Sequence, residues 1–523
     1  MTTGSAKGKI LWVDDEIELL RPHILLLSEK GYSVETSTNG EDAVEMVRSR
    51  PFDLVFLDEM MAGMGGLRTL SLMKDLRPEL PIIMITKNED EGLMEEAIGV
   101  KISDYLTKPV NPSQILLACK KFLEGKKITG EYVSRDYTKE FNEISMSLQL
   151  SPSAQDWTSI YARLVDWSIE MDHHPELGLK QTLTYQIREC NVEFSKYIER
   201  NYRHWLEQKN RPALSVDIID RYLLPELRSE QSVFLFVIDC LRMDQWMMME
   251  EMLRELYEVK REYYFSILPT ATPYSRNAIF SGAYPEEIEI RFPEIWAQWE
   301  DDDNSRNRYE HQFMDKLLER RKVKLQPDSK YVKILDADFG KSIEQGILSY
   351  TKSRLTAIVV NFVDMLAHGR SDSELLKEIA PDEAAYRSLT KSWFTHSSLY
   401  GMLRTLSRQK NVRIILTTDH GSIRSLRGTK VLGDREASTN LRYKYGRNLK
   451  ADDRHAILIK NPGDFRLPKR GVTINYLIAK EDFYFVYPTE YHKYIAQYRD
   501  SFQHGGVSME EMILPVVKLT PKG

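Results

Sequence analysis

The sequence predicts an α/β multidomain protein in which two strand-containing regions flank a helical bundle. Short apolar strands alternate with amphipathic helices over residues 1–124, strands are missing over residues 125–208, and apolar strands return over residues 209–523. The chain has 523 residues, which is the length of about three domains. We therefore expect a first domain at 1–124, a helical bundle or linker at 125–208, and a third domain at 209–523.

The composition excludes several classes of protein. Hydrophobic residues make up 42% of the chain, which is too many for a mainly disordered protein. The formal net charge of −6 argues against a globally basic nucleic-acid coat protein. Three distant cysteines cannot form a disulfide framework, and no apolar run is long enough for a signal peptide or a membrane span. We expect a cytoplasmic protein without membrane insertion.

In the first region, the apolar runs at 9–15, 53–59, 81–87 and 103–109 read as strands of a parallel sheet. Each of them ends in polar side chains: Asp14, Asp15, Asp58, Thr86 and Lys108. Carboxyl ends of parallel strands meet at one edge of a sheet, so these side chains should lie together. Clustered carboxylates suit Mg²⁺, which would neutralise an incoming phosphoryl group and let Asp58 attack it.

This set resembles the receiver domain of two-component response regulators over about residues 8–124. The resemblance implies a flavodoxin-like fold, Mg²⁺ ligands at Asp14, Asp15 and Asp58, and phosphorylation of Asp58 by a sensor histidine kinase. It also implies that Thr86 is the switch hydroxyl, Tyr105 the switch aromatic residue and Lys108 the signalling lysine. The alternative is that acidic strand ends merely cap a solvated edge, and the complete ordered set argues against it.

The second region shows helical periodicity. Its apolar residues recur at helical spacing in two stretches: Trp157, Ile160, Tyr161, Leu164 and Val165, then Leu183, Ile187, Cys190, Phe194 and Tyr197. We interpret these stripes as the core of a small bundle that serves as a spacer or a dimerisation module.

Three apolar runs of the third region, 233–239, 356–364 and 413–421, contain Asp239, Asp364 and Asp419 near their ends. His368 follows Asp364 by four residues, which places both on one helical face, and His420 is adjacent to Asp419. With His504 these six residues exceed what one tetrahedral zinc ion needs and fit two metal ions. Imidazole with carboxylate favours zinc, and manganese or iron is also compatible.

A candidate nucleophile lies in the segment 268–282. Thr272 precedes Pro273, and Gly282 closes the segment, so the pattern predicts a helix with Thr272 as its N-cap. A hydroxyl at a helix N-terminus that is also close to a metal ion could attack phosphorus. The alternative is that Thr272 only caps the helix.

The ordered set resembles the alkaline phosphatase superfamily, and HGGVSMEEMILPVV is similar to the end of PglZ domains within it, over about residues 230–523. The resemblance implies one zinc ion held by Asp239, Thr272, Asp419 and His420, and another held by Asp364, His368 and His504. Thr272 would form a phosphothreonine that water cleaves. The segment around Thr272 looks like the nucleotide pyrophosphatase/phosphodiesterase branch, in which an asparagine follows by three residues. Ser275 occupies that position here, and Asn277 is the candidate replacement.

The segment from Arg424 to Lys450 carries eight basic and two acidic residues, interleaved with Tyr443 and Tyr445. Such a segment suits a nucleotide chain, with Arg442 and Lys444 as candidate substrate-binding residues. The alternative is an exposed loop whose charge aids solubility.

A receiver, a helical bundle and a PglZ-type domain in this order resemble the PorX-type response regulators of Bacteroidetes, which act with the type 9 secretion system. The resemblance implies a phosphorylation-dependent homodimer, a nucleotide or oligonucleotide substrate, and a transcription factor or secretion-system component as a further partner. The first hypothesis is a response regulator with a two-zinc phosphodiesterase as output. The alternative is a metal-bound but catalytically silent scaffold for a protein partner or transcription factor. Direct DNA binding by the bundle is poorly supported, because it has no basic recognition helix.

Overall fold

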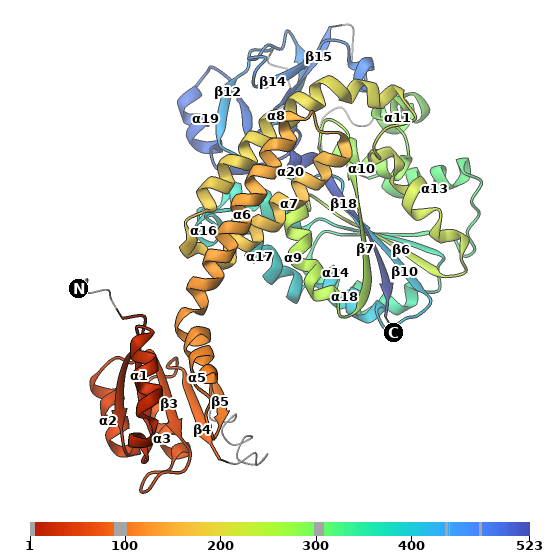
Figure 1. The fold of residues 1–523 in the computed structure, drawn as a ribbon. Coiled ribbons are helices and arrows are strands. Elements are labelled where there is room, and N and C mark those ends of the chain that lie inside the picture. The colour runs from red at the N-terminus through yellow and green to blue at the C-terminus, as the bar shows by residue number, and fades with distance from the viewer. Residues whose placement is uncertain are drawn as a thin grey trace. The chain divides into compact units, whose positions relative to one another are not determined.

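The computed structural model describes residues 6–87, 102–297, 308–434, 438, 440–469 and 473–522, except for the side chains of 126–128, 296 and 297. The chain divides into two compact units, Met1–Lys139 and Glu140–Gly523 (Figure 1). The division lies inside helix α6 (Gly125–Gln149), and the bundle shares one unit with the strands that follow it. The expected domain limits at residues 124 and 208 therefore stay predictions.

The first unit contains a five-stranded parallel sheet with the strand order β2-β1-β3-β4-β5. Its strands are β1 (Lys9–Val13), β2 (Ser33–Ser37), β3 (Leu54–Asp58), β4 (Ile82–Thr86) and β5 (Asp104–Thr107). The described helices are α1 (Arg21–Glu29), α2 (Gly40–Ser49), α3 (Gly66–Leu76) and α5 (Pro112–Cys119). This order is that of the flavodoxin-like fold and confirms the predicted fold class. Strand β2 was not predicted, because its sequence SVETS has no apolar run.

The second unit begins with the end of α6 and continues with α7 (Ala154–His173) and α8 (Lys180–Glu207). Ser153 caps α7 by accepting a hydrogen bond from the backbone N–H of Asp156. The predicted aromatic stripe is core: Trp157 and Phe194 are buried, and their ring centroids lie 5.2 Å apart. Phe194 also stacks on Phe265 of the main sheet at 6.4 Å, so the bundle packs directly on the domain that follows it.

The main sheet of this unit has six strands in the order β7-β18-β10-β6-β9-β8. Their bounds are β7 (Tyr257–Phe265), β18 (Ile513–Pro521), β10 (Val412–Thr417), β6 (Ser232–Ile238), β9 (Leu355–Val360) and β8 (Lys330–Ile334). The four strands from β10 to β8 are mutually parallel, whereas β18 runs antiparallel to both of its neighbours. The carboxyl ends of β10, β6 and β9 therefore share one edge.

Helices pack around this sheet and beside three small sheets, whose strands lie between β10 and β18 in the chain (Figure 1). The helices are α9 (Met243–Leu253), α10 (Thr272–Ser281), α11 (Pro285–Arg291), α12 (Pro293–Ala297), α13 (Glu310–Arg320), α14 (Ala337–Tyr350), α15 (Phe362–Asp372), α16 (Glu374–Ile379), α17 (Glu383–His396), α18 (Ser398–Leu406), α19 (Tyr491–Tyr498) and α20 (Met509–Met512). The small sheets pair β11 (Ile423–Ser425) with β17 (Ser501–Gln503), β12 (Arg427–Lys430) with β16 (Phe483–Val486), and β15 (Ile474–Ala479) with β13 (Tyr443–Arg447) and β14 (Ala456–Ile459). Within the described parts of the chain, every helix is too short or too polar to cross a lipid bilayer.

Two local details differ from the sequence analysis. β9 ends at Val360, so Asp364 lies in the first turn of α15 and not on the strand itself. Helix α10 begins one residue earlier than expected, with Ala271 as its N-cap and Thr272 as its first residue. Thr272 is therefore not the N-cap, and its hydroxyl contacts Asp239 and His420.

Candidate functional site

The carboxyl edge of the first unit brings three carboxylates together. Ligand oxygens of Asp14, Asp15 and Asp58 lie within 4.8 Å of one another. Lys108 Nζ lies 3.0 Å from Asp14 Oδ2 and 2.9 Å from Asp58 Oδ1. Burial raises the pKa of the Asp58 carboxyl, and the charges of Asp14 and Asp15 act in the same direction. One ammonium group does not balance three carboxylates, so the cluster fits a divalent cation such as Mg²⁺.

The two switch candidates lie on the adjacent strands β4 and β5 and differ in exposure. The hydroxyl of Thr86, the last residue of β4, donates a hydrogen bond to Glu59. Tyr105 on β5 is 46% exposed. Their roles as switch residues stay predictions.

In the second unit, one candidate ligand set surrounds Thr272. Asp239 directly follows β6, and Asp419 and His420 lie just beyond β10, so the parallel strands deliver them to one edge. Thr272 Oγ1 lies 2.9 Å from His420 Nε2 and 3.4 Å from Asp239 Oδ1. His420 Nε2 lies 3.7 Å from oxygens of both Asp239 and Asp419.

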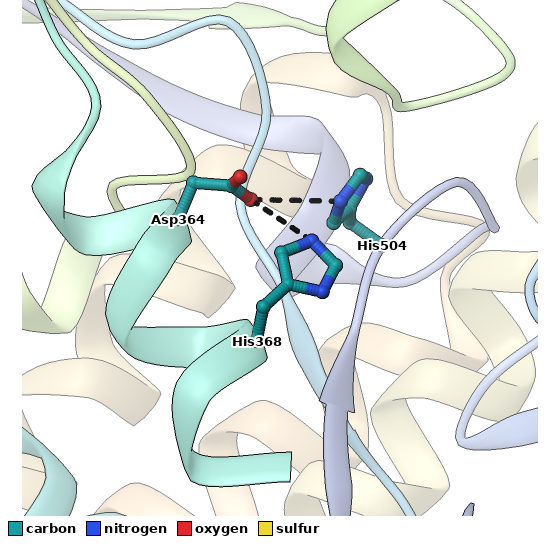
Figure 2. Close-up of side chains that lie close together, drawn as sticks. All are labelled: Asp364, His368 and His504. Carbon is teal, nitrogen blue, oxygen red and sulfur yellow. Dashed lines mark ion pairs between the residues drawn. The ribbon is translucent and has the colours of Figure 1, made fainter. Parts of the chain in front are cut away.

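The second candidate ligand set comes from α15 and the loop after β17. Figure 2 shows Asp364, His368 and His504 pointing toward one another. Asp364 Oδ1 lies 3.5 Å from His368 Nε2 and 3.6 Å from His504 Nε2. The oxygen is buried and has no hydrogen-bond partner within the described residues.

These separations fit a shared metal ion better than direct hydrogen bonds. Ligands of a tetrahedral zinc ion, at about 2.0–2.1 Å from the metal, lie roughly 3.3–3.4 Å apart. The gaps of 3.5 and 3.6 Å around Asp364 are close to that value and longer than an N–H···O hydrogen bond. The ring centroids of His420 and His504 lie 4.2 Å apart, so the two ligand sets are adjacent. The donor atoms of both sets therefore fit two neighbouring ions.

The electrostatics of the site also fit cations. Burial raises the pKa of Asp239 well above its usual range, and the carboxylates of Asp419 and Asp364 add to this effect. A bound cation would relieve that penalty. Burial lowers the pKa of His504 to about 3, so the imidazole is neutral at pH 7, which is the form that binds metals. His420 Nδ1 lies 3.0 Å from the carbonyl oxygen of Gly421, which orients Nε2 toward Thr272.

Arg276 completes this site, although the sequence motifs did not indicate it. Its buried guanidinium forms an ion pair with Asp239, lies 3.0 Å from Asp419 Oδ2 and 3.4 Å from Glu310 Oε1. Arg276 follows Thr272 by four residues, so both lie on one face of α10. The spacing of four residues between Thr272 and Arg276 could have predicted that Arg276 belongs to the site.

Comparisons with known proteins agree with this geometry. The family described as "BREX system PglZ alkaline phosphatase-like domain" matches residues 218–519, which is more than half of the chain. The chain belongs to this PglZ family. The response regulator receiver domain matches residues 10–120, and the PorX response regulator linker domain matches residues 127–206. The chain is thus a response regulator with the PorX-type order of domains.

Similar curated proteins are transcriptional regulatory proteins that match part of this chain. The alginate biosynthesis transcriptional regulatory protein AlgB of Pseudomonas aeruginosa is 34% identical over 128 residues, which cover 24% of this chain and 28% of AlgB. The transcriptional regulatory protein ZraR of Salmonella typhi is 34% identical over 193 residues, covering 36% of this chain and 43% of ZraR. The chain therefore spans less than half the length of these relatives.

Solved structures match the same region. A CheY-like receiver domain protein from Methanospirillum hungatei is 27% identical, covers 23% of this chain and 96% of that chain, and has a TM-score of 0.22. CheY4 of Vibrio cholerae is 28% identical, covers 22% of this chain and 98% of that chain, and has a TM-score of 0.22.

In the PglZ domain, the side chains of Asn277 and Ser275 form hydrogen bonds with the backbone of their own helix, α10. Asn277 Nδ2 donates to the carbonyl oxygen of Pro273 at 2.9 Å, and Ser275 Oγ donates to that of Ala271 at 2.9 Å. Both side chains are fully buried. These contacts give no support to Asn277 as the replacement for the asparagine of the phosphodiesterase branch, and that role stays a prediction.

The two other substrate-binding candidates of the PglZ domain require a correction. Arg442 is fully buried and pairs with Glu511, with Nε 3.2 Å from Oε1. Lys444 is 1% exposed, and its Nζ donates to the carbonyl oxygens of Ser438 and Asn440 at 2.8 Å each. Burial lowers the pKa of Lys444 to about 7. Neither side chain reaches the surface, so both hold the fold of β13 in place.

The rest of the basic segment is also not one exposed loop. Arg424 pairs with Asp500, and Arg427 pairs with Glu481 and Asp482. Other cations of the segment are exposed: Lys430, Arg447 and Lys450. Arg435 lies outside the described residues. The segment forms β11, β12 and β13, and several of its side chains are buried inside the domain.

Proposed function

We propose that this chain is a response regulator whose output domain is a zinc-dependent phosphodiesterase acting on nucleotide-type phosphodiesters. The observation that carries the proposal is the position of Thr272 Oγ1, which lies 2.9 Å from His420 Nε2 within the first ligand set and beside the second. A threonine hydroxyl at a helix start, surrounded by carboxylate and imidazole, is an arrangement that supports phosphoryl transfer.

The residues that would hold zinc fall into two sets. The first set is Asp239, Thr272, Asp419 and His420, and the second is Asp364, His368 and His504. When bound, two zinc ions supply electrostatic stabilisation of the phosphate charge and lower the pKa of a coordinated hydroxyl. The first set would include the nucleophile. The second set is adjacent to it, because the rings of His420 and His504 stack on each other.

The residues of this chain orient and protect the reacting hydroxyl. Thr272 is 8% exposed, so the group reaches the surface while bulk water is largely excluded. In the proposed reaction its oxygen forms a bond to phosphorus, one ester oxygen takes up a proton and leaves as an alcohol, and a phosphothreonine that keeps the other ester group remains. Water then attacks that phosphorus, and Thr272 and the second product are released. The backbone N–H of Thr272 lies at the N-terminal end of α10, where the partial positive charge of the helix favours phosphoryl oxygens.

The finer parts of the proposal rest on resemblance. Arg442 and Lys444 are buried and give no support to a nucleotide-type substrate. This preference therefore rests on the likeness of the Thr272 segment to the nucleotide pyrophosphatase/phosphodiesterase branch. We propose that a sensor histidine kinase phosphorylates Asp58 with Mg²⁺ bound, and that the chain then forms a homodimer in the cytoplasm. A link to type 9 secretion, through a secretion-system component or a transcription factor, follows the PorX-type architecture.

The decisive experiment is turnover of a chromogenic phosphodiester with added zinc. We expect wild-type activity that depends on zinc, and at least about a thousandfold loss for Thr272→Ala. Thr272→Ser, which keeps a hydroxyl, should retain more activity than Thr272→Ala. Equal turnover by wild type and Thr272→Ala would contradict the proposal and favour the silent scaffold.

A further inference from the structure

Helix α8 of the bundle makes polar contacts with the segment that carries His504. Asn191, Ser195 and Glu199 are spaced by four residues and therefore form a stripe on one face of α8. Asn191 and Ser195 are buried, with 3% and 1% exposure. Ser195 Oγ lies 3.4 Å from the carbonyl oxygen of Val507, and Glu199 pairs with Lys480 Nζ at 2.7 Å.

Asn191 makes three of these hydrogen bonds with the segment that follows His504. Its Oδ1 accepts a hydrogen bond from the backbone N–H of Met509 at 2.8 Å. Its Nδ2 donates to both carboxylate oxygens of Glu510, at 3.1 and 2.9 Å. One amide side chain thus fixes both the backbone and a side chain at the start of α20.

The same segment contacts residues next to the candidate nucleophile and metal ligands. Thr270 Oγ1 accepts from Gly505 N–H at 3.1 Å and donates to the carbonyl oxygen of Gly506 at 2.8 Å. Gly421 N–H donates to the carbonyl oxygen of Glu511 at 3.2 Å. Thr270 is two residues from Thr272, Gly421 follows His420, and Gly505 follows His504.

This connection has little free space. Gly505 has a φ of 115°, which other residues rarely adopt. A Cβ at Gly506 would lie 2.3 Å from the Arg442 guanidinium and 2.6 Å from the carbonyl oxygen of Ala479. A displacement at Met509 and Glu510 is therefore passed along the backbone toward His504, since close packing leaves no room to absorb it.

We propose that Asn191 is a positioning residue that fixes the His504 segment, so that the helical bundle sets the geometry of the second metal site. The test of this inference by zinc affinity rests on the proposed function, whereas the test by backbone hydrogen exchange does not. The bundle then acts on the output site through a defined pair of contacts, and it is more than a spacer.

The first arm measures amide hydrogen exchange of residues 505–510 in the full-length, metal-free protein. Asn191→Ala should speed exchange at least about tenfold there, because Met509 N–H loses its partner. The matched control is Asn201→Ala on the same helix, whose Nδ2 donates to the carbonyl oxygen of Tyr197. Asn201→Ala should leave exchange at 505–510 unchanged.

The second arm measures zinc affinity of the full-length protein by competition with a chelator. Wild type should bind two zinc ions, and Asn191→Ala should weaken one of them about tenfold, as loss of a ligand-orienting contact does. Asn201→Ala should match wild type. If wild type itself binds no zinc, the proposed function fails, and the exchange arm still decides this inference.

A charge-swapped pair tests the contact itself. Asn191→Asp places two carboxylates face to face and should speed exchange at 505–510. Combining it with Glu510→Gln restores a donor opposite an acceptor and keeps the net charge, so exchange and zinc affinity should return toward wild type. Wild-type exchange and zinc affinity in Asn191→Ala, or no rescue by the pair, would overturn the proposal.

Discussion

Arg276 and Asp419 form an ion pair in which Nε lies 3.0 Å from Oδ2 and neither side chain has any exposed surface. The same guanidinium pairs with Asp239 and Glu310. A buried charge costs much free energy unless it is paired, so this arginine holds the acidic side of the candidate site together.

Arg276→Met should therefore destabilise the protein by about 3–5 kcal/mol, because it leaves buried carboxylates without a partner. The measurement is the urea midpoint of unfolding. The control is Arg291→Met, whose pair with Glu287 is exposed at 40% and 34% and should contribute no more than about 1 kcal/mol. Equal midpoints for the two variants would show that Arg276 does not stabilise the site.

Arg442, just before β13, and Arg447, at its end, should differ sharply in their effect on stability. Arg442→Ala leaves the buried carboxylate of Glu511 unpaired and should cost about 3–5 kcal/mol of stability. Arg447 is the exposed last residue of β13, so Arg447→Ala should change the free energy of unfolding by no more than about 0.5 kcal/mol. A stable Arg442→Ala protein with weaker substrate binding would instead restore the substrate-binding interpretation.

Glu510 should make stability depend on pH. Burial raises the pKa of its carboxyl to about 7, although contacts with Asn191 and Arg242 lower that pKa in part. Between the unfolded value of about 4.5 and 7, the folded protein holds the proton that the unfolded chain has lost, so wild-type stability falls as pH rises. Glu510→Gln removes this slope.

The corresponding measurement compares thermal midpoints of metal-free wild type and Glu510→Gln from pH 5 to pH 8. The midpoint of the variant should rise relative to wild type across this range, whatever constant offset the lost hydrogen bond adds. A constant difference at every pH would mean that Glu510 titrates normally.

Mg²⁺ should stabilise the receiver domain. The carboxylates of Asp14, Asp15 and Asp58 outnumber the Lys108 ammonium, so a cation at a hundred times its Kd should add about 2.7 kcal/mol. Asp58→Asn should lose this gain and should also fail to accept a phosphoryl group from acetyl phosphate. The exposed Asp75, changed to Asn, is the control and should respond to Mg²⁺ as wild type does. An equal gain for Asp58→Asn would place the ion elsewhere.

Much of the fold could be predicted from local patterns. Apolar runs ending in acidic residues identified β1, β3, β6 and β10, and the spacing of Asp364 and His368 matched the helical turn of α15. The short strand β2 was missed, because a half-exposed edge strand needs no apolar run. Strand polarity and the edge rule were sufficient to expect that Asp239, Asp364 and Asp419 lie near one another.

The sequence by itself determined which residues have metal-binding and nucleophilic chemistry and in which order they occur, because this information is carried by residue type and by spacing along one strand or helix. Only the tertiary structure decided that Arg276 faces Asp239 and Asp419, that Arg442 is inside and not on a basic surface, and that Asn191 reaches Met509. Burial and contacts between distant segments depend on how helices pack on the sheet. No local spacing in the chain encodes them.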